Sequence, residues 1–249
     1  MPPIDLETTE ARAAAAGGAE KRAYVRRIFS EIAPRYDLLN HLLSFNIDRR
    51  WRRRAIAILD PTRRPGGVFV DLCAGTLDVA AELSRTRGFR GLVLGTDFAE
   101  PMLRAGLAKA PRVLVAPVTA DAVELPLAGN SVAGAIVAFG IRNVADLDAA
   151  LREVRRVLAP GARLVILEFS TPRSALVRAA YHTYFHAVLP TVGRLVSGHP
   201  TAYSYLPASV ENFPAEERLA ELMTRAGLRD VRWRPLTLGI AAIHVGARE

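Results

Sequence analysis

Apolar residues gather in five short runs in the middle of the chain, and each run is about as long as one buried strand. The runs cover residues 68–72, 91–97, 113–117, 132–139 and 162–169. Short apolar runs bounded by turn residues are typical of parallel strands that are buried on both faces. Helical spacing of apolar residues separates them, over 79–87, 101–109 and 146–158. This alternation predicts right-handed β–α–β units with helices on both faces of one sheet.

Helical spacing also dominates both flanks of this region. Apolar residues recur with the helical period from Ala23 to Leu59, and Pro34 divides the stretch because proline disfavours helical geometry in the residue before it. A second helical stretch is predicted over 174–196, with a break at Pro190. The last predicted elements are a helix over 215–226 and strands over 231–235 and 240–247. The expected fold is therefore α/β and Rossmann-like: a mostly parallel, seven-stranded sheet with an N-terminal helical cap.

The domain organisation follows from the same pattern. Residues 1–20 carry few large apolar side chains, which predicts a frayed tail. We expect one domain over 21–249, with a helical lid at 21–60 and an insertion on the substrate side at about 172–212.

Composition narrows the class of protein. Half of the 249 residues are apolar, which is typical of a globular chain. The single cysteine, Cys73, excludes an internal disulfide framework and a four-cysteine zinc site, and we predict no metal. The N-terminus shows no signal-peptide pattern, so a cytoplasmic location is expected.

The net charge of +8 has two interpretations. Nearly all the cations are arginines, which fits a codon bias expressed on a solvated surface. It equally fits attraction to a polyanion such as an anionic membrane leaflet. The densest cluster, Arg49, Arg50, Arg52, Arg53 and Arg54, surrounds Trp51 beside an apolar run. This pattern favours peripheral contact with the inner face of the plasma membrane, although a helical lid with one wet face would show it too.

Three acids lie at the carboxyl ends of the first three predicted strands. Asp71 and Asp97 are among the last residues of the first two strands, and Asp121 follows the third. In open parallel sheets, ligands bind beyond the carboxyl ends of the strands. Asp97 stands 22 residues after Gly75, where a carboxylate accepts hydrogen bonds from a ribose diol. Each acid alone also fits a helix N-cap or a turn. Together they favour a nucleoside-bearing cofactor.

The glycines choose between cofactors. A dinucleotide needs several glycines so that the backbone can approach the pyrophosphate, and this loop offers only Gly75. S-adenosylmethionine has no phosphate and fits one glycine flanked by acidic and hydroxyl side chains. The spacing therefore argues against a nicotinamide-dependent oxidoreductase.

Four further segments are more specific than this loop. They are 35–40 (RYDLLN), 138–144 (AFGIRNV), 167–170 (LEFS) and 203–210 (YSYLPASV). With them, the chain from about Lys21 onward resembles the quinone-biosynthesis C-methyltransferases, which methylate demethylmenaquinol or a polyprenyl benzoquinol precursor of ubiquinone. The resemblance implies a class I methyltransferase fold, S-adenosylmethionine as cofactor and a polyprenylated quinol as substrate. A homodimer is a further expectation.

The resemblance also implies particular site residues. Carried over position by position, it places Thr76, Asp97, Asp121, Ala122 and Ala138 at the cofactor, beside the Asp71 and Gly75 of the loop argument. It places Tyr36, Arg142 and Asn143 around the substrate ring.

One departure from the family pattern leaves an alternative open. Leu77 stands where the family has the second glycine of G-T-G-D, and a side chain there would approach the cofactor's methionine moiety. The alternative function is thus a non-catalytic quinone-binding or assembly protein. A nucleic-acid methyltransferase is disfavoured, because no N-P-P-Y-type base pocket follows the fourth strand.

The chemistry of ring methylation suggests roles for these residues. A quinol carbon becomes nucleophilic when a neighbouring hydroxyl loses its proton. Arg142 suits stabilisation of the quinolate, because its pKa is too high for a base. A bound water, His182 or His186 is then the expected proton acceptor. The i,i+4 spacing of the two histidines also fits a zinc pair, or histidines that are simply packed or on the surface. Residues 38–51 and 176–196 are expected to supply apolar surface for the tail.

Overall fold

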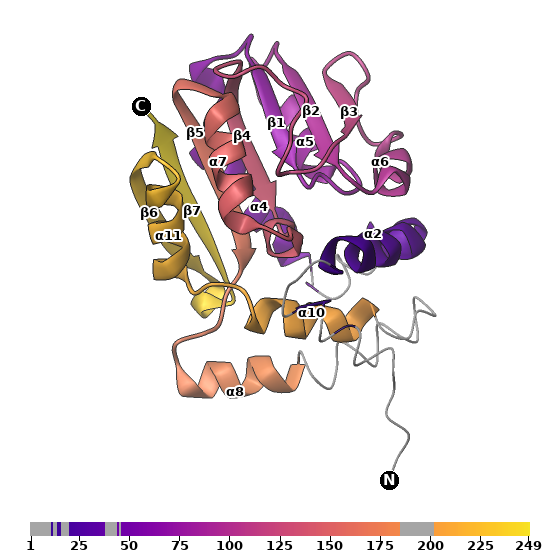
Figure 1. Cartoon of the computed structure of the whole chain (residues 1–249), viewed down its shortest axis with the longest axis vertical. Coiled ribbons are helices and arrows are strands. Elements are labelled where there is room, and N and C mark those ends of the chain that lie inside the picture. The colour runs from indigo at the N-terminus through magenta and orange to yellow at the C-terminus, as the bar shows by residue number, and fades with distance from the viewer. Residues whose placement is uncertain (1–10, 12–13, 16–19, 38–43, 45, 185–201) are drawn as a thin grey trace.

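The computed structural model describes residues 11, 14–15, 20–37, 44, 46–184 and 202–249. Its centre is a seven-stranded sheet in the order β3-β2-β1-β4-β5-β7-β6 (Figure 1). The strands are β1 (Val68–Leu72), β2 (Leu92–Asp97), β3 (Val115–Thr119), β4 (Val132–Ala138), β5 (Leu158–Phe169), β6 (Leu228–Leu236) and β7 (Ala241–Arg248). β7 pairs antiparallel with both of its neighbours and every other pairing is parallel. The predicted fold class is confirmed.

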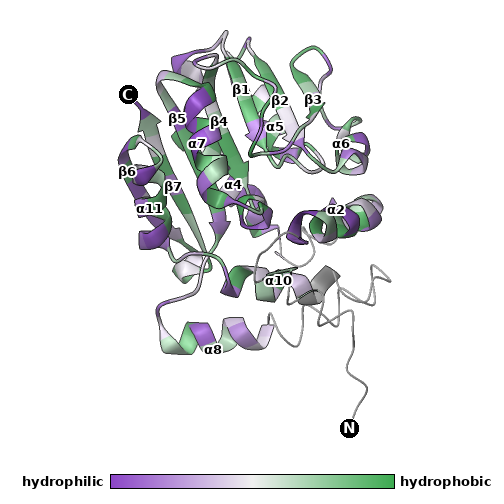
Figure 2. Cartoon of the chain, in the orientation of Figure 1, coloured by the Kyte–Doolittle hydropathy of each residue, from purple (hydrophilic) through white to green (hydrophobic). Residues whose placement is uncertain are grey.

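Helices cover both faces of this sheet. The helices of the two layers are α4 (Ile47–Leu59), α5 (Asp78–Ser84), α6 (Glu100–Gly106), α7 (Leu147–Val157) and α11 (Glu216–Arg225). One apolar cluster joins α4 and α5 to the sheet, and another joins α7 and α11 to the opposite face. Figure 2 shows the hydrophilic side of α7 and α11 turned away from the apolar strands. β1 serves both clusters, because Phe69 points into the first and Val70 into the second.

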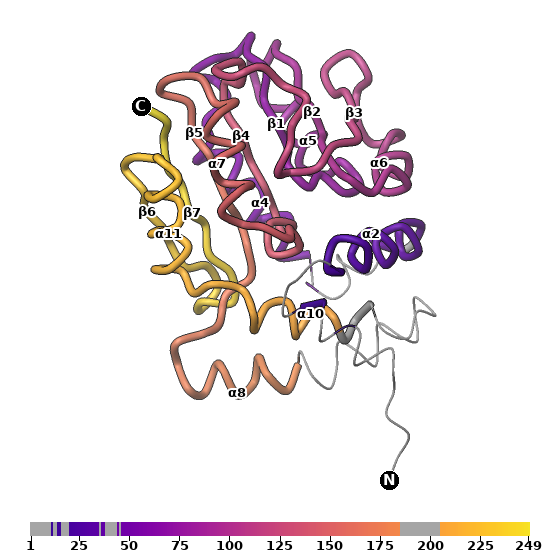
Figure 3. Tube along the Cα trace, viewed as in Figure 1, coloured from indigo at the N-terminus to yellow at the C-terminus, as the bar shows by residue number. Residues whose placement is uncertain are grey.

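Three further α-helices and one 3-10 turn lie beyond the carboxyl ends of the parallel strands. They are α2 (Lys21–Ile32), the short 3-10 turn η1 (Ala33–Arg35), α8 (Ala175–Thr183) and α10 (Ala202–Glu211). α2 and α10 share an apolar cluster in which the rings of Tyr24 and Tyr205 are 5.6 Å apart. The trace in Figure 3 runs from β5 out to α8, and from α10 back to α11. Two segments far apart in the sequence therefore cover the same end of the sheet.

Only part of the predicted lid lies over this end. Pro34 ends α2 as expected, and η1 follows it. α4 instead packs against a sheet face, because Trp51, Ala55, Ile56 and Leu59 form one apolar stripe.

Other strand and helix boundaries also differ from the predicted ones. β3 begins two residues later than expected, because Leu114 and Val115 both donate backbone hydrogen bonds to Pro111 in a turn that leaves Val113 exposed. β5 begins earlier, at Leu158. α10 was not predicted as a helix, since Pro207 stands inside it. Of the stretch predicted over 174–196, the part from 185 on lies outside the described residues, as does most of the predicted tail. No helix among the described residues is long and apolar enough to cross a membrane.

Candidate active site

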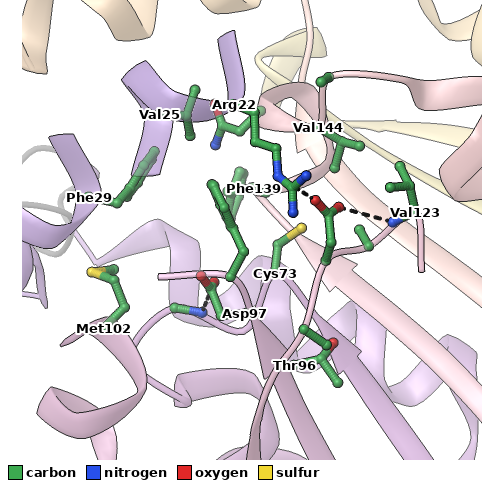
Figure 4. Close-up of a pocket in the computed structure, with 18 of the residues that line it drawn as sticks. Arg22, Val25, Phe29, Cys73, Thr96, Asp97, Met102, Val123, Phe139 and Val144 are labelled. Carbon is green, nitrogen blue, oxygen red and sulfur yellow. Dashed lines mark hydrogen bonds and ion pairs between the residues drawn. The ribbon is translucent and has the colours of Figure 1, made fainter. Parts of the chain in front are cut away.

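A cavity of about 180 Å³ lies at the carboxyl ends of β1 to β4, with α2 on one side (Figure 4). The residues predicted from the sequence that line it are Tyr36, Gly75, Asp97, Asp121, Ala122 and Asn143. Around them stand apolar side chains from α2, α6 and the loops, including Phe29, Met102 and Phe139. The cavity thus combines an apolar wall with a few convergent polar groups, as small-molecule sites do.

Asp97, at the end of β2, holds the loop that follows β1. Its Oδ2 accepts a hydrogen bond from the backbone N–H of Gly75 at 2.9 Å, and its Oδ1 accepts one from Ala99 at 2.8 Å. Burial raises the pKa of Asp97, while these backbone donors act in the opposite direction. Each oxygen keeps a second lone pair, so the carboxylate can still accept hydrogen bonds from a diol.

Asp121, beyond β3, is held from two sides. Its Oδ1 accepts a hydrogen bond from the backbone of Val123 at 3.1 Å. Its Oδ2 pairs with Nε of Arg22 at 2.8 Å, a cation that reaches across from α2 (Figure 4). Arg22 could not be predicted from the sequence, since nothing in its neighbourhood marks a partner so distant in the chain. The structure thus adds a cation from the cap to the acid predicted at this strand end.

The glycine loop has room for a ligand despite Leu77. Gly75 adopts a left-handed φ of +50°, and a Cβ there would lie 3.4 Å from Met102 and 3.8 Å from Tyr36. Leu77 is fully buried and lies outside the cavity lining. Its Cδ2 would be 2.3 Å from a Cβ on Gly95, so the absence of a side chain in β2 makes the space for it. The expected approach of Leu77 to the cofactor is therefore wrong: its side chain belongs to the core.

Three predicted cofactor residues lie outside the lining. Asp71 is buried and accepts a hydrogen bond from the backbone of Ala80 at 2.9 Å, in the first turns of α5. Desolvation raises its pKa to about 8. Thr76 donates its hydroxyl to Asp37, and Ala138 packs on the first apolar cluster. These residues support the cavity from behind.

Arg142 is buried beside the cavity and does not line it. With Glu168 and Ser209 it forms a cluster of polar side chains that we call the polar knot. Nη1 of Arg142 lies 2.8 Å from Oε1 of Glu168, and its Nε lies 3.2 Å from Oγ of Ser209. The guanidinium also stacks 5.5 Å from the centre of the Phe169 ring. Burial raises the pKa of Glu168, and Arg142 acts in the opposite direction. Three of the four segments that carry the family resemblance meet here: 138–144, 167–170 and 203–210. Glu168 and Ser209, the partners of Arg142, belong to these segments, although neither was predicted as a site residue.

Asn143 has the opposite environment to its neighbour. Its side chain lines the cavity with 8% of its surface exposed, and its Oδ1 has no hydrogen-bond partner among the described residues. This oxygen is enclosed by the protein, where an acceptor without a donor is costly. The backbone of this turn is tied to α2, because Nζ of Lys21 donates to the carbonyl of Arg142 at 2.8 Å.

His182 does not join the site. The His182 side chain is 65% exposed and lies 3.8 Å from Glu211, and it is absent from the cavity lining. His186 lies outside the described residues. No group of three or more His, Cys, Asp or Glu side chains in the described part of the chain could hold a metal ion. Of the expected proton acceptors, His182 therefore lies away from the cavity, bound water stays a candidate, and His186 is not placed by the described residues.

The acids and the unpaired amide suit a nucleoside with an uncharged or cationic extension. Asp97 and Asp121 stand at neighbouring strand ends, as the sugar and base of one nucleoside require. Gly75 lets the backbone of the β1 loop come close to a ligand. Asn143 supplies an amide group at the β4 end, where a second reactant would enter.

Comparison with known proteins agrees with this arrangement. The model of the ubiE/COQ5 methyltransferase family matches residues 18–248. The demethylmenaquinone methyltransferase of Thermus thermophilus is 49% identical over 223 residues, which cover 89% of this chain and all of that protein. The ubiquinone/menaquinone biosynthesis C-methyltransferase UbiE of Geobacter sulfurreducens is 44% identical, covering 92% of this chain and 90% of its own length.

Solved structures share the fold at lower identity. A SAM-dependent methyltransferase of Thermotoga maritima superposes with a TM-score of 0.63 at 19% identity, covering 90% of this chain and 100% of the other. A phosphoethanolamine N-methyltransferase of Haemonchus contortus, solved with S-adenosylhomocysteine, gives a TM-score of 0.57 at 14% identity, covering 78% of this chain and 52% of the other. The family match extends over almost the whole chain and is supported by relatives above 40% identity. This chain therefore belongs to the ubiE/COQ5 methyltransferase family.

Proposed function

We propose that this protein is an S-adenosylmethionine-dependent C-methyltransferase that converts demethylmenaquinol to menaquinol, and the benzoquinol of the ubiquinone pathway is the alternative substrate. The names of the two relatives support the reaction and the substrate class. The observation that carries the proposal is the cavity that Asp97, Asp121 and Asn143 line together at the ends of neighbouring strands. The buried position of Leu77 removes the reason for favouring a non-catalytic protein.

The cofactor would lie along the ends of β1, β2 and β3. Asp97 would accept hydrogen bonds from the ribose hydroxyls, and Asp121 with Ala122 would contact the adenine. Gly75 would leave space for the methionine end. The bound cofactor supplies a methyl group on a positively charged sulfur. Asp71, Thr76 and Ala138 would act behind this surface, by fixing the helix and strands that carry it.

The quinol would enter on the β4 side, next to Asn143 and Tyr36. Nδ2 of Asn143 would donate a hydrogen bond to the oxygen of the reacting hydroxyl, which keeps this partner when the hydroxyl ionises, and would so orient the ring carbon toward the methyl group. Water at the cavity mouth would take the hydroxyl proton. The ring carbon would take the methyl group as its bond to sulfur breaks, and a second water would accept the proton of that carbon, which restores the aromatic ring.

Arg142 would act from behind Asn143 in this scheme. Its charge is compensated by Glu168, and its contacts hold the turn that carries Asn143. Its field would still favour the quinolate at short range. This modifies the direct contact expected from the resemblance.

Methyl transfer tests the proposal directly. Purified protein is incubated with isotopically labelled S-adenosylmethionine and demethylmenaquinol under reducing conditions, and the quinones are analysed by mass. We expect labelled menaquinol from the wild type and at least about a hundredfold less from Asn143→Ala, the scale of one preorganised hydrogen-bonding group. A protein that binds the cofactor but methylates neither quinol would contradict the proposal.

We also propose that the protein attaches peripherally to the inner face of the cytoplasmic membrane, where a tailed quinol resides. Arg50 and Arg54 of α4 are exposed, as electrostatic attachment requires, whereas Arg52 is buried between Asp48 and Asp78. Binding to anionic vesicles should fall with salt and in Arg50→Gln/Arg54→Gln. The control removes two exposed cations from α11, in Arg218→Gln/Arg225→Gln. Equal binding of both variants would contradict the assignment. A homodimer stays a prediction, which light scattering would check.

A further inference from the structure

A chain of charges joins the cap to the glycine loop, on the side of the loop away from the cavity. We call it the latch: Asp37, Asp48, Arg52, Asp78 and Lys109. Its members come from four separate places, namely the end of η1, α4, the start of α5 and the turn after α6. None of them lines the cavity.

Lys109 is the centre of the latch. Its Nζ lies 2.6 Å from Oδ2 of Asp37 and 2.6 Å from Oδ1 of Asp78, so one ammonium group bridges two carboxylates. The side chains are partly shielded from solvent, with exposed fractions of 30% for Lys109 and 21% for Asp78. A shared cation at such distances is what lets two carboxylates stand close together.

The two carboxylates fix different parts of the molecule. Asp37 directly follows Tyr36 and also accepts the hydroxyl of Thr76, so it connects the cap to the loop by two independent contacts. Asp78 receives Nη1 of Arg52 at 2.5 Å, and Arg52 in turn lies 3.2 Å from Asp48. Although burial alone would raise the pKa of Asp78, Arg52 and Lys109 hold it below its usual value.

Tyr36 connects the latch to the cavity. Its ring lines the cavity and lies 3.8 Å from the position that a Cβ on Gly75 would occupy. The ring also makes an edge contact with Phe29 of α2 at 5.8 Å. Loss of the bridging ammonium would leave Asp37 and Asp78 repelling each other, and the backbone of Asp37 could relax only by moving Tyr36 from the loop.

We propose that Lys109 is a positioning residue for cofactor binding: by bridging Asp37 and Asp78 it holds Tyr36 against the glycine loop and keeps the cap closed over the cavity. It acts without touching either reactant. Its role in binding rests on the proposed function, but its role in holding the cap does not.

The variants are Lys109→Met, Lys109→Arg, Asp37→Asn and the double variant Lys109→Met/Asp37→Asn. The matched control is Arg104→Met, which removes a cation from α6 whose partner, Glu100, is exposed. Two readouts are used: the dissociation constant of S-adenosylhomocysteine by calorimetry, and amide hydrogen exchange of residues 21–36 without any ligand. Thermal unfolding verifies that each variant is folded.

In Lys109→Met we expect the dissociation constant to rise about tenfold, equivalent to 1.4 kcal/mol, and exchange over 21–36 to accelerate. Lys109→Arg should keep the dissociation constant and the exchange rate close to those of the wild type, and Arg104→Met should change neither quantity. Asp37→Asn should weaken binding in the wild type, because the pairing with Lys109 is lost, and should weaken it no further in Lys109→Met, where it removes the repulsion from Asp78 and keeps an oxygen for Thr76. Methyl transfer should show the loss in KM for the cofactor more than in kcat.

Two results would overturn the inference. One is unchanged exchange over 21–36 in a folded Lys109→Met, and the other is a full additional loss from Asp37→Asn in that background. If the wild type binds no S-adenosylhomocysteine, the proposed function fails, and hydrogen exchange alone still decides whether Lys109 holds the cap.

Discussion

The two halves of the cavity are built in different ways. In the cofactor half, each acid is held by backbone N–H groups, mostly nearby in sequence: Asp97 by Ala99, Asp121 by Val123 and Asp71 by Ala80. In the substrate half, Arg142 depends on side chains 26 and 67 residues away, in Glu168 and Ser209.

This difference teaches which half depends on tertiary packing. Backbone donors of a strand–turn–helix unit are in place once the unit forms, so Asp71 and Asp97 need little help from the cap, whereas Asp121 also pairs with Arg22 of α2. The polar knot around Arg142 forms only when β4, β5 and α10 come together. Substitutions should therefore affect cofactor binding alone in the first half, and stability together with turnover in the second.

The largest effect is expected in the polar knot. Glu168→Ala would leave the guanidinium of Arg142 buried without its carboxylate, which costs about 3–5 kcal/mol of unfolding free energy. Urea unfolding measures this loss. Glu217→Ala is the control, because it removes the carboxylate of an exposed pair with Arg173 and should change stability little. Equal stability of the two variants would mean that the knot is not a buried ion pair in solution.

The next effect tests the cofactor half by itself. Asp97→Asn replaces an acceptor oxygen by a donor group, and a hydrogen bond to a charged partner contributes about 1.5–3 kcal/mol. Cofactor affinity by calorimetry should fall at least about tenfold, while the melting temperature changes less than in Glu168→Ala. The exposed Asp148→Asn provides the control. Wild-type affinity in Asp97→Asn would remove Asp97 from the site.

A third effect tests the packing behind the glycine loop. A Cβ on Gly95 would lie 2.3 Å from Leu77, so Gly95→Ala should cost about 1–3 kcal/mol through overpacking. Gly66→Ala has nothing within 4 Å and should be tolerated. Combining Gly95→Ala with Leu77→Ala should cost less than the sum of the two single changes, as unfolding measurements would reveal. Strict additivity would show that the two residues do not share this space.

A further effect is a dependence on pH. Burial raises the pKa of Asp71 to about 8 in the folded protein, whereas the ordinary pKa of an aspartate is 3.8. The folded state therefore binds more protons than the unfolded chain between these values, and the free energy of unfolding falls as the pH rises through this range.

Asp71→Asn removes this titration and can still accept from the backbone of Ala80. Its unfolding free energy should fall less steeply than that of the wild type between about pH 5 and pH 8. Asp97 and Glu168, whose pKa values are also raised by burial, keep part of the slope. Asp148→Asn should retain the full slope, and an unchanged slope in Asp71→Asn would contradict the assignment.

Local chemistry explains which site residues were predictable. Asp97 and Asp121 stand at strand ends that the apolar runs reveal, and a strand end in a parallel sheet has a known relation to ligands. Arg22 and Lys109 could not be found in this way, because each meets its partner across elements with no fixed sequence spacing. Leu77 was misjudged, because the direction of a side chain in a left-handed turn depends on the space left by Gly95.

The sequence by itself determined the order of strands and helices, the cofactor acids and the family, because hydrophobic period, turn residues and short motifs are local properties. Only the tertiary structure decided which of those residues reach the cavity. It turned Asn143 toward the site and buried Arg142 against Glu168, although the two are neighbours in the chain. The physical reason is that burial and charge pairing depend on contacts between distant segments, which no local pattern encodes.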